Sequence, residues 1–263
     1  MRVSIITPTF NSEKYIRSAL ESIKSQTYPD IEHVVMDNLS TDNTREICSN
    51  YSNKFISQKD SSMYEALNNG IARSTGDILA FLNSDDLYPE SDTIRKVVDC
   101  FGRNKDVDVV YGNCEMVDEN LNYLYLHKPK VLNFKFAIKR VFVVIHQAIF
   151  VRADIFKKYG LYDLNLRYMA DCEYWIRLLR ENVKFKYYDE KLAVFRRHAN
   201  NMSVNTKDGL KETKYIMSKY GYKHNGVRQA AYLLKDYMNN PDYLAYSAKR
   251  RLCKMCDFLK KRI

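Results

Sequence analysis

Four short apolar runs, each followed by a polar loop and a helical pattern, constrain the fold of this chain more than any other feature. The runs lie at residues 2–7, 31–36, 54–58 and 77–82. After the first run, apolar residues recur at helical spacing from Tyr15 to Ile23. Strands that alternate with helices of this length predict an α/β fold with a mainly parallel, right-handed sheet, whose polar loops gather along one edge.

Two adjacent carboxylates follow the fourth apolar run. The segment Asn83-Ser84-Asp85-Asp86 lies where that run ends, and open α/β sheets bind ligands beyond the carboxyl ends of their strands. Neighbouring carboxylates repel each other, and oxygen ligands of this kind suit Mg²⁺ or Mn²⁺ bridging to a substrate diphosphate. The alternative is that Ser84 or Asp85 caps the next helix.

Other polar residues are expected at the same edge of the sheet. The loop after the first run offers backbone N–H groups and a helix amino terminus to an anion, and the topology brings Thr9, Asp37 and Asn68 toward Asp85. The first strand is not followed by Gly-x-Gly-x-x-Gly, and the chain lacks a P-loop motif. Neither a dinucleotide-dependent dehydrogenase nor a P-loop NTPase is therefore supported.

Several ordered motifs resemble those of the family 2 glycosyltransferases of GT-A fold. They lie at residues 4–11, 25–32, 37–44, 75–86, 146–147, 170–178 and 196–203. The resemblance covers roughly residues 1 to 205, and the chain is most similar to enzymes that build bacterial surface polysaccharides. It implies an inverting, metal-dependent transfer of a hexose or N-acetylhexosamine from a UDP-sugar to a hydroxyl group, with Mn²⁺ or Mg²⁺ as cofactor.

The resemblance also implies roles for individual residues. Asp171 matches the catalytic base, with Glu173 as the next candidate, and Asp37 matches the residue that recognises uracil. The implied nucleotide-sugar site contains Thr7, Pro8, Thr9, Asn11, Asp37, Asp60, Asn68, Asn83, Ser84, Asp85 and Arg197. Either Arg197 or Arg196 is expected to balance the phosphate charge. The implied metal ligands are Asp85, Asp86 and His198, and the residues expected near the sugar or the acceptor are His146, Gln147 and Glu173.

Two departures from the family pattern keep a second function open. Asn83 replaces the first Asp of the metal motif, so it can accept a hydrogen bond but carries no charge, and Ala170 replaces the Glu before the base. A nucleotide-sugar-binding subunit without catalysis is the alternative. Asp171 read by itself could instead stabilise a helix amino terminus, and His146-Gln147 could be a strand end exposed to water.

Nearly all of the net charge of +10 lies in the last part of the chain. Residues 1–205 carry 28 basic and 27 acidic residues, whereas residues 206–263 carry 14 and 5. We expect a catalytic domain at 1–205, with a nucleotide-sugar half at about 1–112 and an acceptor half at 113–205, and a basic helical extension at 206–263. In the extension, helical periodicity runs from about Lys207 to Tyr220.

The last 17 residues predict a basic amphipathic helix that suits an anionic membrane surface. Nucleic-acid binding is an alternative explanation of the same basic charge, but the sequence has no array of aromatic residues for stacking on bases and no known nucleic-acid-binding module. The simplest alternative is a solvated helix packed on the catalytic domain. The chain lacks an apolar run of 18 residues, a signal peptide pattern and a disulfide framework among its six cysteines. We expect a cytoplasmic protein at the inner face of the membrane that uses a saccharide acceptor on a lipid-diphosphate carrier.

Overall fold

The structure is a computed structural model, and it describes residues 1–51, 54–129, 132–141, 144–202 and 206–223. The strands are β1 (Val3–Thr9), β2 (Ile31–Asp37), β3 (Lys54–Ser57), β4 (Ile78–Phe81), β5 (Val109–Val117), β6 (Tyr123–His127), β7 (Ile149–Arg152) and β8 (Phe185–Arg196). The helices are α1 (Ile16–Lys24), α2 (Thr44–Ser49), α3 (Met63–Arg73), α4 (Thr93–Arg103), α5 (Phe134–Arg140), η1 (His146–Ala148), α6 (Ala153–Tyr159), α7 (Ala170–Arg180) and α8 (Thr206–Lys219).

The described strands form one sheet in the order β3-β2-β1-β4-β7-β5-β6, with β8 paired to β5. Strands β3, β2, β1 and β4 are parallel, and β8 is parallel to β5, whereas β7 runs antiparallel to both β4 and β5. The predicted α/β fold with a mainly parallel central sheet is confirmed. The carboxyl ends of the first four strands therefore meet at one edge of the sheet.

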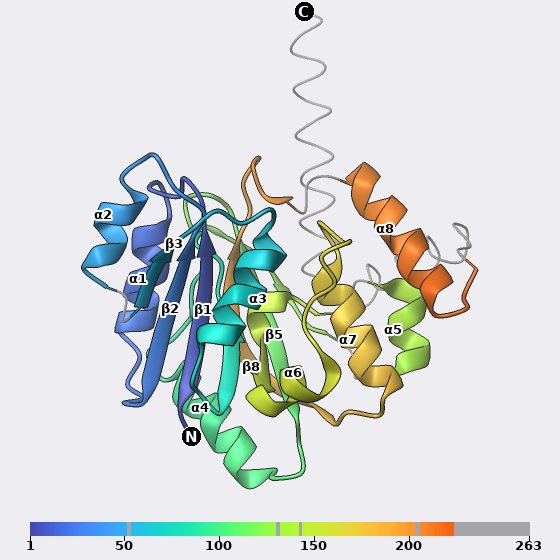
Figure 1. The fold of residues 1–263 in the computed structure, drawn as a ribbon. Coiled ribbons are helices and arrows are strands. Elements are labelled where there is room, and N and C mark those ends of the chain that lie inside the picture. Colours follow the sequence, from blue (N-terminus) through green and yellow to red (C-terminus); the bar gives the residue numbers. More distant parts are fainter. Residues whose placement is uncertain (52–53, 130–131, 142–143, 203–205, 224–263) are drawn as a thin grey trace, which may run out of the picture.

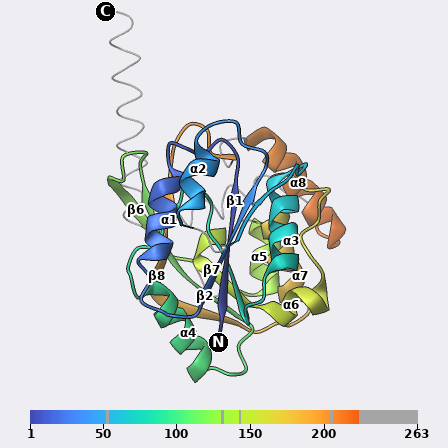
Figure 2. The same ribbon diagram turned by 60° about the vertical axis from the view of Figure 1, so that its left-hand side comes forward.

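Helices cover both faces of the sheet (Figure 1). All seven residues of β1 are buried, as expected for a parallel strand between two layers. Successive side chains point to opposite faces, so Ile5 packs in the cluster that contains α4, and Ile6 packs in the cluster that contains α3 and α7. Figure 2 shows α1 and α2 on one side of β1 and α3 on the other.

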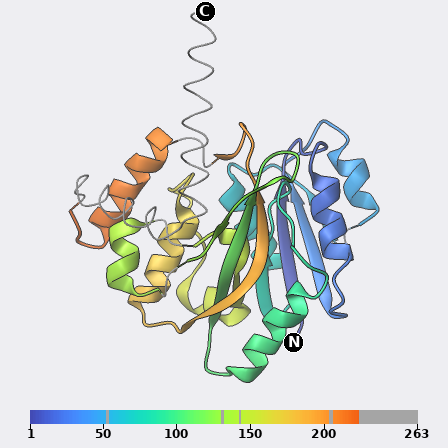
Figure 3. The same ribbon diagram turned by 180° about the vertical axis from the view of Figure 1, so that it is seen from behind.

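Helix α8 packs on the same core as the helices before it. Ile216 is fully buried, Met217 is 5% exposed, and both belong to the cluster that holds α7. Figure 3 shows α8, α5 and α7 grouped on the side of the molecule away from α1. The helix predicted from Lys207 to Tyr220 is confirmed, and it shares a hydrophobic core with residues before 206. The domain boundary at residue 206 stays a prediction.

The predicted amphipathic helix at residues 247–263 lies outside the described residues. Within the described ranges, every helix is too short or too polar to cross a bilayer. Among the described residues, Cys48, Cys100, Cys114 and Cys172 are buried and form no disulfide.

Candidate functional site

The loops after β1 and β2 are joined by side-chain to backbone hydrogen bonds. The amide of Asn11 donates to Ser40 Oγ at 2.9 Å, and the amide of Thr41 donates to Asn11 Oδ1 at 2.9 Å. Asn11 has a φ of 46°, a left-handed conformation that Asn tolerates better than most residues. Asn11, which was expected in the nucleotide-sugar site, therefore holds the loop at the carboxyl edge of the sheet in its conformation.

Asp37 reaches the predicted edge, but both of its carboxylate oxygens already have donors. Its side chain is 1% exposed and accepts hydrogen bonds from the Ser40 hydroxyl and from Ser57 Oγ, the latter at 2.6 Å. The Ser40 amide adds a longer contact. In this geometry Asp37 braces the ends of β2 and β3, and its role in recognising uracil stays a prediction.

Three other predicted residues carry buried side-chain oxygens without a hydrogen-bond partner among the described residues. These atoms are Thr9 Oγ1, Asp60 Oδ2 and Asn83 Oδ1. The other oxygen of Asp60 accepts from Gln58 Nε2 at 2.9 Å and Asn69 Nδ2 at 2.7 Å. Buried polar atoms are nearly always paired, so these three oxygens are suited to receive hydrogen bonds from a ligand.

The structure does not bring the side chains of Thr7 and Asn68 to this edge. Thr7 Oγ1 lies 3.0 Å from His33 Nε2 in the core, because residue 7 stands inside the strand and both faces of the sheet are covered. The amide of Asn68 bonds both the N–H and the C=O of Tyr162 at 3.0 Å. Its donor and acceptor are thus used to join α3 to the loop before α7. Pro8 is also buried within β1.

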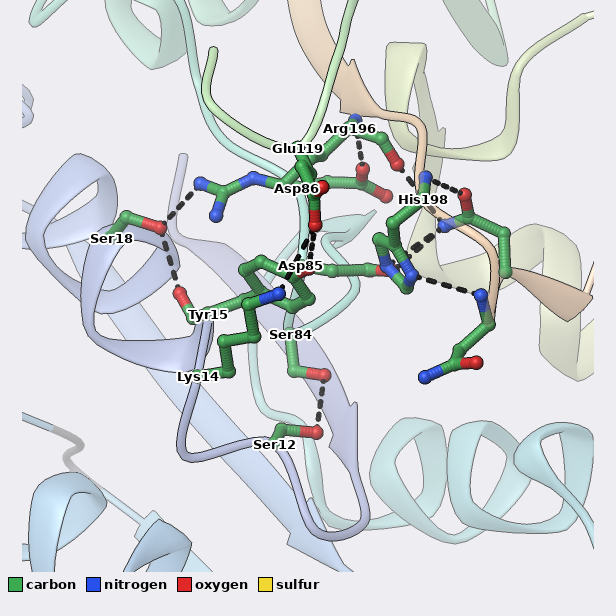
Figure 4. Close-up of polar contacts among 12 residues, drawn as sticks. Ser12, Lys14, Tyr15, Ser18, Ser84, Asp85, Asp86, Glu119, Arg196 and His198 are labelled. Atoms are coloured by element: carbon green, nitrogen blue, oxygen red, sulfur yellow. Dashed lines mark hydrogen bonds and ion pairs between the residues drawn. The ribbon is translucent and has the colours of Figure 1, made fainter. Parts of the chain in front are cut away.

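Asp85 and His198 form the centre of the predicted metal site, although 113 residues separate them. Asp85 Oδ2 lies 2.9 Å from His198 Nε2, and Asn201 Nδ2 lies 3.1 Å from the same oxygen (Figure 4). The side chains are 22% and 10% exposed, so an ion could reach them. Ser84, the residue before Asp85, contacts Ser12 through their hydroxyls at 2.9 Å, which joins the loops after β1 and β4.

Asp86 points away from this pair and into the protein. Its side chain is fully buried; one oxygen accepts the Arg196 N–H at 2.9 Å, and the other accepts from Gln147 Nε2. Burial and the neighbouring charge of Asp85 raise the pKa of Asp86 well above its usual value. With both oxygens engaged, Asp86 supports the loop, and the geometry favours Asp85 as the metal ligand.

Of the two candidate arginines, Arg196 lies beside the carboxylates. The guanidinium of Arg196 donates to Ser18 Oγ at 2.7 Å, and the charges of Asp85 and Asp86 act on it. Arg197 instead reaches Tyr125 Oη at 3.4 Å. Successive residues of an extended chain point to opposite sides, so of two adjacent arginines only one can face the site.

The donor atoms at Asp85 and His198 fit a divalent ion held partly by substrate. Among the described residues, no group of three His, Cys, Asp or Glu side chains could hold a metal by itself. Ions that act on diphosphates are commonly bound by one or two carboxylates together with phosphate oxygens and water. One carboxylate and one imidazole, with the orphaned oxygen of Asn83 two residues away, are consistent with such a site.

Asp171 begins the second candidate group, in the first turn of α7. It is 9% exposed, and the Tyr64 hydroxyl donates to its Oδ1 at 2.8 Å. His146 is close enough for the charge of Asp171 to act on it, but burial dominates and lowers the pKa of His146 to about 4. The His146 ring stacks on Phe81 with centroids 4.7 Å apart, so His146 and Gln147 are buried, contrary to a water-exposed strand end.

Glu173 is not brought to the site. Its fully buried carboxylate accepts from Arg177 at 2.7 Å and from two residues at the end of α8, Lys219 at 2.9 Å and Tyr220 at 2.7 Å. Residues two apart lie on different faces of a helix, so Glu173 and Asp171 cannot both face one ligand. In this structure Glu173 attaches the end of α8 to α7, and its contact with the sugar or the acceptor stays a prediction.

Several residues around the site were missed by sequence reasoning. Tyr64, Asn201 and Tyr15 contact the candidate base or metal ligands. The carboxylate of Glu212 on α8 accepts the three consecutive backbone N–H groups of residues 167–169, just before α7. A Glu in an amphipathic helix gives no local signal for such a contact, because its partners lie more than 40 positions away.

Comparisons with known proteins find relatives of this chain. The family model described as glycosyl transferase family 2 matches residues 4–160. An uncharacterised glycosyltransferase of Rickettsia typhi is 32% identical over 214 residues, which cover 78% of this chain and 66% of that protein. The chain thus spans about two thirds of the length of that relative.

Two solved structures show the same fold at lower sequence identity. S. aureus TarS 1–349 in complex with UDP-GlcNAc has a TM-score of 0.66 at 19% identity, covering 82% of this chain and 65% of that one. Glucosyl-3-phosphoglycerate synthase from Mycobacterium tuberculosis, with Mn²⁺, UDP and glucosyl-3-phosphoglycerate, has a TM-score of 0.62 at 15% identity, covering 86% and 82%.

Proposed function

This chain belongs to glycosyl transferase family 2 and has the GT-A fold, and from that premise we propose that it is an inverting glycosyltransferase. The donor is a UDP-sugar carrying a hexose or an N-acetylhexosamine. The observation that carries the proposal is the Asp85–His198 pair at the carboxyl edge of the sheet. The orphaned oxygens of Thr9, Asp60 and Asn83 support it, since ribose hydroxyls and a base N–H could donate to them.

Asp85 and His198 would hold Mn²⁺ or Mg²⁺ in this proposal. The chemistry that a bound ion supplies there is neutralisation of the charge on the leaving diphosphate. The chain's own groups do the rest: the backbone N–H of Arg196 and the side-chain amide of Gln147 each donate to one oxygen of the Asp86 side chain. These contacts hold the loop after β4 in place, so that Asp85 faces outward.

Asp171 acts as the general base. Tyr64 holds Oδ1, and the carboxylate accepts the proton of the acceptor hydroxyl while that oxygen attacks the anomeric carbon from the face opposite the diphosphate. The new glycosidic bond forms as the bond to the diphosphate breaks, and a single displacement inverts the anomeric configuration. Burial of Asp171 to 9% exposure limits competition from water.

The acceptor is a saccharide on a lipid-diphosphate carrier, and the protein is peripherally bound to the inner face of the membrane. The support is the charge distribution, because residues 206–263 hold 14 basic and 5 acidic residues. Basic residues near an anionic surface contribute about 1 kcal/mol each. Deleting residues 247–263 should then reduce pelleting with anionic liposomes but leave UDP binding unchanged; equal pelleting of both proteins would refute membrane attachment.

Donor use can be tested with a panel of UDP-, GDP- and TDP-sugars, with Mn²⁺ or with EDTA. We expect hydrolysis or transfer from UDP-sugars that needs the ion and is lost in Asp85→Ala. Asp106→Ala is the matched control, since Asp106 is an exposed carboxylate before β5, away from the site. Donor binding without turnover, for any sugar and acceptor, would instead favour a nucleotide-sugar-binding subunit.

A further inference from the structure

We propose that Tyr15 is a positioning residue that holds the imidazole of His198 in the orientation needed to bind a divalent ion. This inference rests on the proposed function, because it assumes that His198 is a metal ligand. It adds a residue from the opposite end of the chain to that site. Tyr15 is the residue just before α1, and it contacts His198 through its ring face.

The two rings are stacked. Their centroids are 4.8 Å apart, and their planes are inclined by 26°. Figure 4 shows the Tyr15 ring between the guanidinium of Arg196 and the imidazole of His198. The Arg196 Cζ atom lies 4.7 Å from the centroid of the Tyr15 ring. The Tyr15 ring therefore contacts both the guanidinium cation of Arg196 and the imidazole of His198. The electron-rich faces of an aromatic ring favour such contacts.

The backbone of Tyr15 is itself held in place by hydrogen bonds. The Tyr15 N–H donates to the Ser12 carbonyl at 3.0 Å, and Ser18 Oγ donates to the Tyr15 carbonyl at 2.7 Å. Ser18 Oγ also accepts from Arg196 at 2.7 Å. A single hydroxyl thus fixes the Tyr15 backbone and the guanidinium that lies over its ring.

Hydrogen bonds act only at the edge of the His198 ring. Nδ1 faces the Asn200 N–H at 3.3 Å, and Nε2 faces Asp85 Oδ2 at 2.9 Å and Asn201 Nδ2 at 3.1 Å. These in-plane contacts set where the nitrogens point, but they do not resist tilting of the ring as strongly as contact with its face. Stacking on Tyr15 supplies that resistance, so removing the Tyr15 ring should loosen the nitrogen that binds the ion.

The hydroxyl of Tyr15 contributes little to this role. It lies 3.4 Å from Glu119 Oε2, a long contact to a carboxylate that also accepts from Lys14 at 3.1 Å. Tyr15→Phe should therefore behave like the wild type, whereas Tyr15→Ala removes the stack. Because Tyr15 is only partly buried, neither change opens the core. Tyr15→Leu keeps the apolar bulk but has no aromatic face, and it replaces Tyr15→Ala in the test if the alanine variant does not fold.

The test measures the affinity for UDP by calorimetry, once with Mn²⁺ and once with EDTA. Electron paramagnetic resonance measures the concentration of free Mn²⁺ and so gives the affinity for Mn²⁺. In the wild type Mn²⁺ should tighten UDP binding. Tyr15→Ala should weaken Mn²⁺ binding in the presence of UDP by about 10- to 100-fold, the usual effect of removing a residue that orients a metal ligand. UDP affinity in EDTA should not change, and Tyr15→Phe should restore the wild-type values.

The outcomes separate this inference from the proposed function. If Mn²⁺ has no effect on the wild type, the proposed metal site fails and the inference fails with it. If the wild type responds to Mn²⁺ and Tyr15→Ala responds equally, only the inference is wrong. A loss of UDP affinity in EDTA as large as the loss with Mn²⁺ would show that Tyr15 contacts the nucleotide, and it would overturn the positioning role.

Discussion

Replacing Glu212 by alanine should destabilise the protein by about 3 kcal/mol and slow its catalysis. The Glu212 carboxylate accepts three backbone N–H groups, from Arg167 at 2.8 Å and from Tyr168 and Met169 at 2.9 Å each. Hydrogen bonds to a charged group contribute about 1.5–3 kcal/mol each when buried. Because Arg167 is exposed and Glu212 is only partly buried, water can replace part of these hydrogen bonds in the variant. Each bond should therefore contribute about 1 kcal/mol to the free energy of unfolding.

Thermal unfolding at pH 7 measures this effect. A loss of about 3 kcal/mol corresponds to a decrease in Tm of roughly 6–12 °C for a chain of this size. Glu212→Gln retains one acceptor oxygen and should show an intermediate decrease. Lys214→Ala, an exposed change on the same helix, is the control and should stay within 2 °C, an order-of-magnitude bound for surface changes.

Activity of the Glu212 variants tests the link to Asp171, the proposed base. The three N–H groups lie in the turn directly before Ala170, so releasing that turn should displace Asp171 in the first turn of α7. We expect a lower kcat at a temperature where the variant is still folded. An alanine variant with wild-type Tm would refute the reasoning, because it would show that α8 does not fix the start of α7.

Three further changes test other contacts. Burial by itself would raise the pKa of Glu173, but its basic partners and Tyr220 hold that pKa below the ordinary value of 4.5; this stabilisation is present above 4.5 and lost as pH falls through the lower folded pKa. Urea midpoints of wild type and Glu173→Gln should therefore differ at pH 7 and converge toward pH 3. Asp85→Ala should abolish the Mn²⁺ enhancement of UDP binding, seen by calorimetry, with unchanged circular dichroism. Asp60→Asn places an amide donor where Oδ2, which we propose accepts an N–H of the nucleobase, now lacks a partner. Binding assays should therefore show a smaller preference for UDP over CDP, and an unchanged preference would show that the nucleobase binds elsewhere.

The first four strands and the edge of the sheet where their polar loops gather were predicted from the sequence. Apolar runs such as 77–82 and the helical spacing from Ile16 to Ile23 depend on local periodicity, which is visible without coordinates. The positions of Asp85, Asn83 and Thr9 at one edge follow from parallel strands meeting there. Thr9 ends β1 beside Asp37, and Asn83 and Asp85 follow β4, which is parallel to β1; their roles in binding stay predictions.

The directions of individual side chains were harder to predict. Arg196 and Arg197 are adjacent, and which one faces the carboxylates depends on the register of β8 against β5. Asp171 and Glu173 are similarly close in sequence, but the helix turns Glu173 toward α8. Contacts such as Glu212 with the turn before α7 join segments more than 40 residues apart, and only tertiary packing decides them.

The measurement that tests the central claim most directly is single-turnover transfer by Asp171→Asn from a UDP-sugar that the wild type uses. The change preserves shape but cannot accept a proton at neutral pH, so transfer should slow by about 10²- to 10⁴-fold. UDP affinity with Mn²⁺ should equal that of the wild type, since Asp85 and His198 are untouched. Transfer at a near wild-type rate, with donor binding intact, would contradict the assignment of Asp171 as the base.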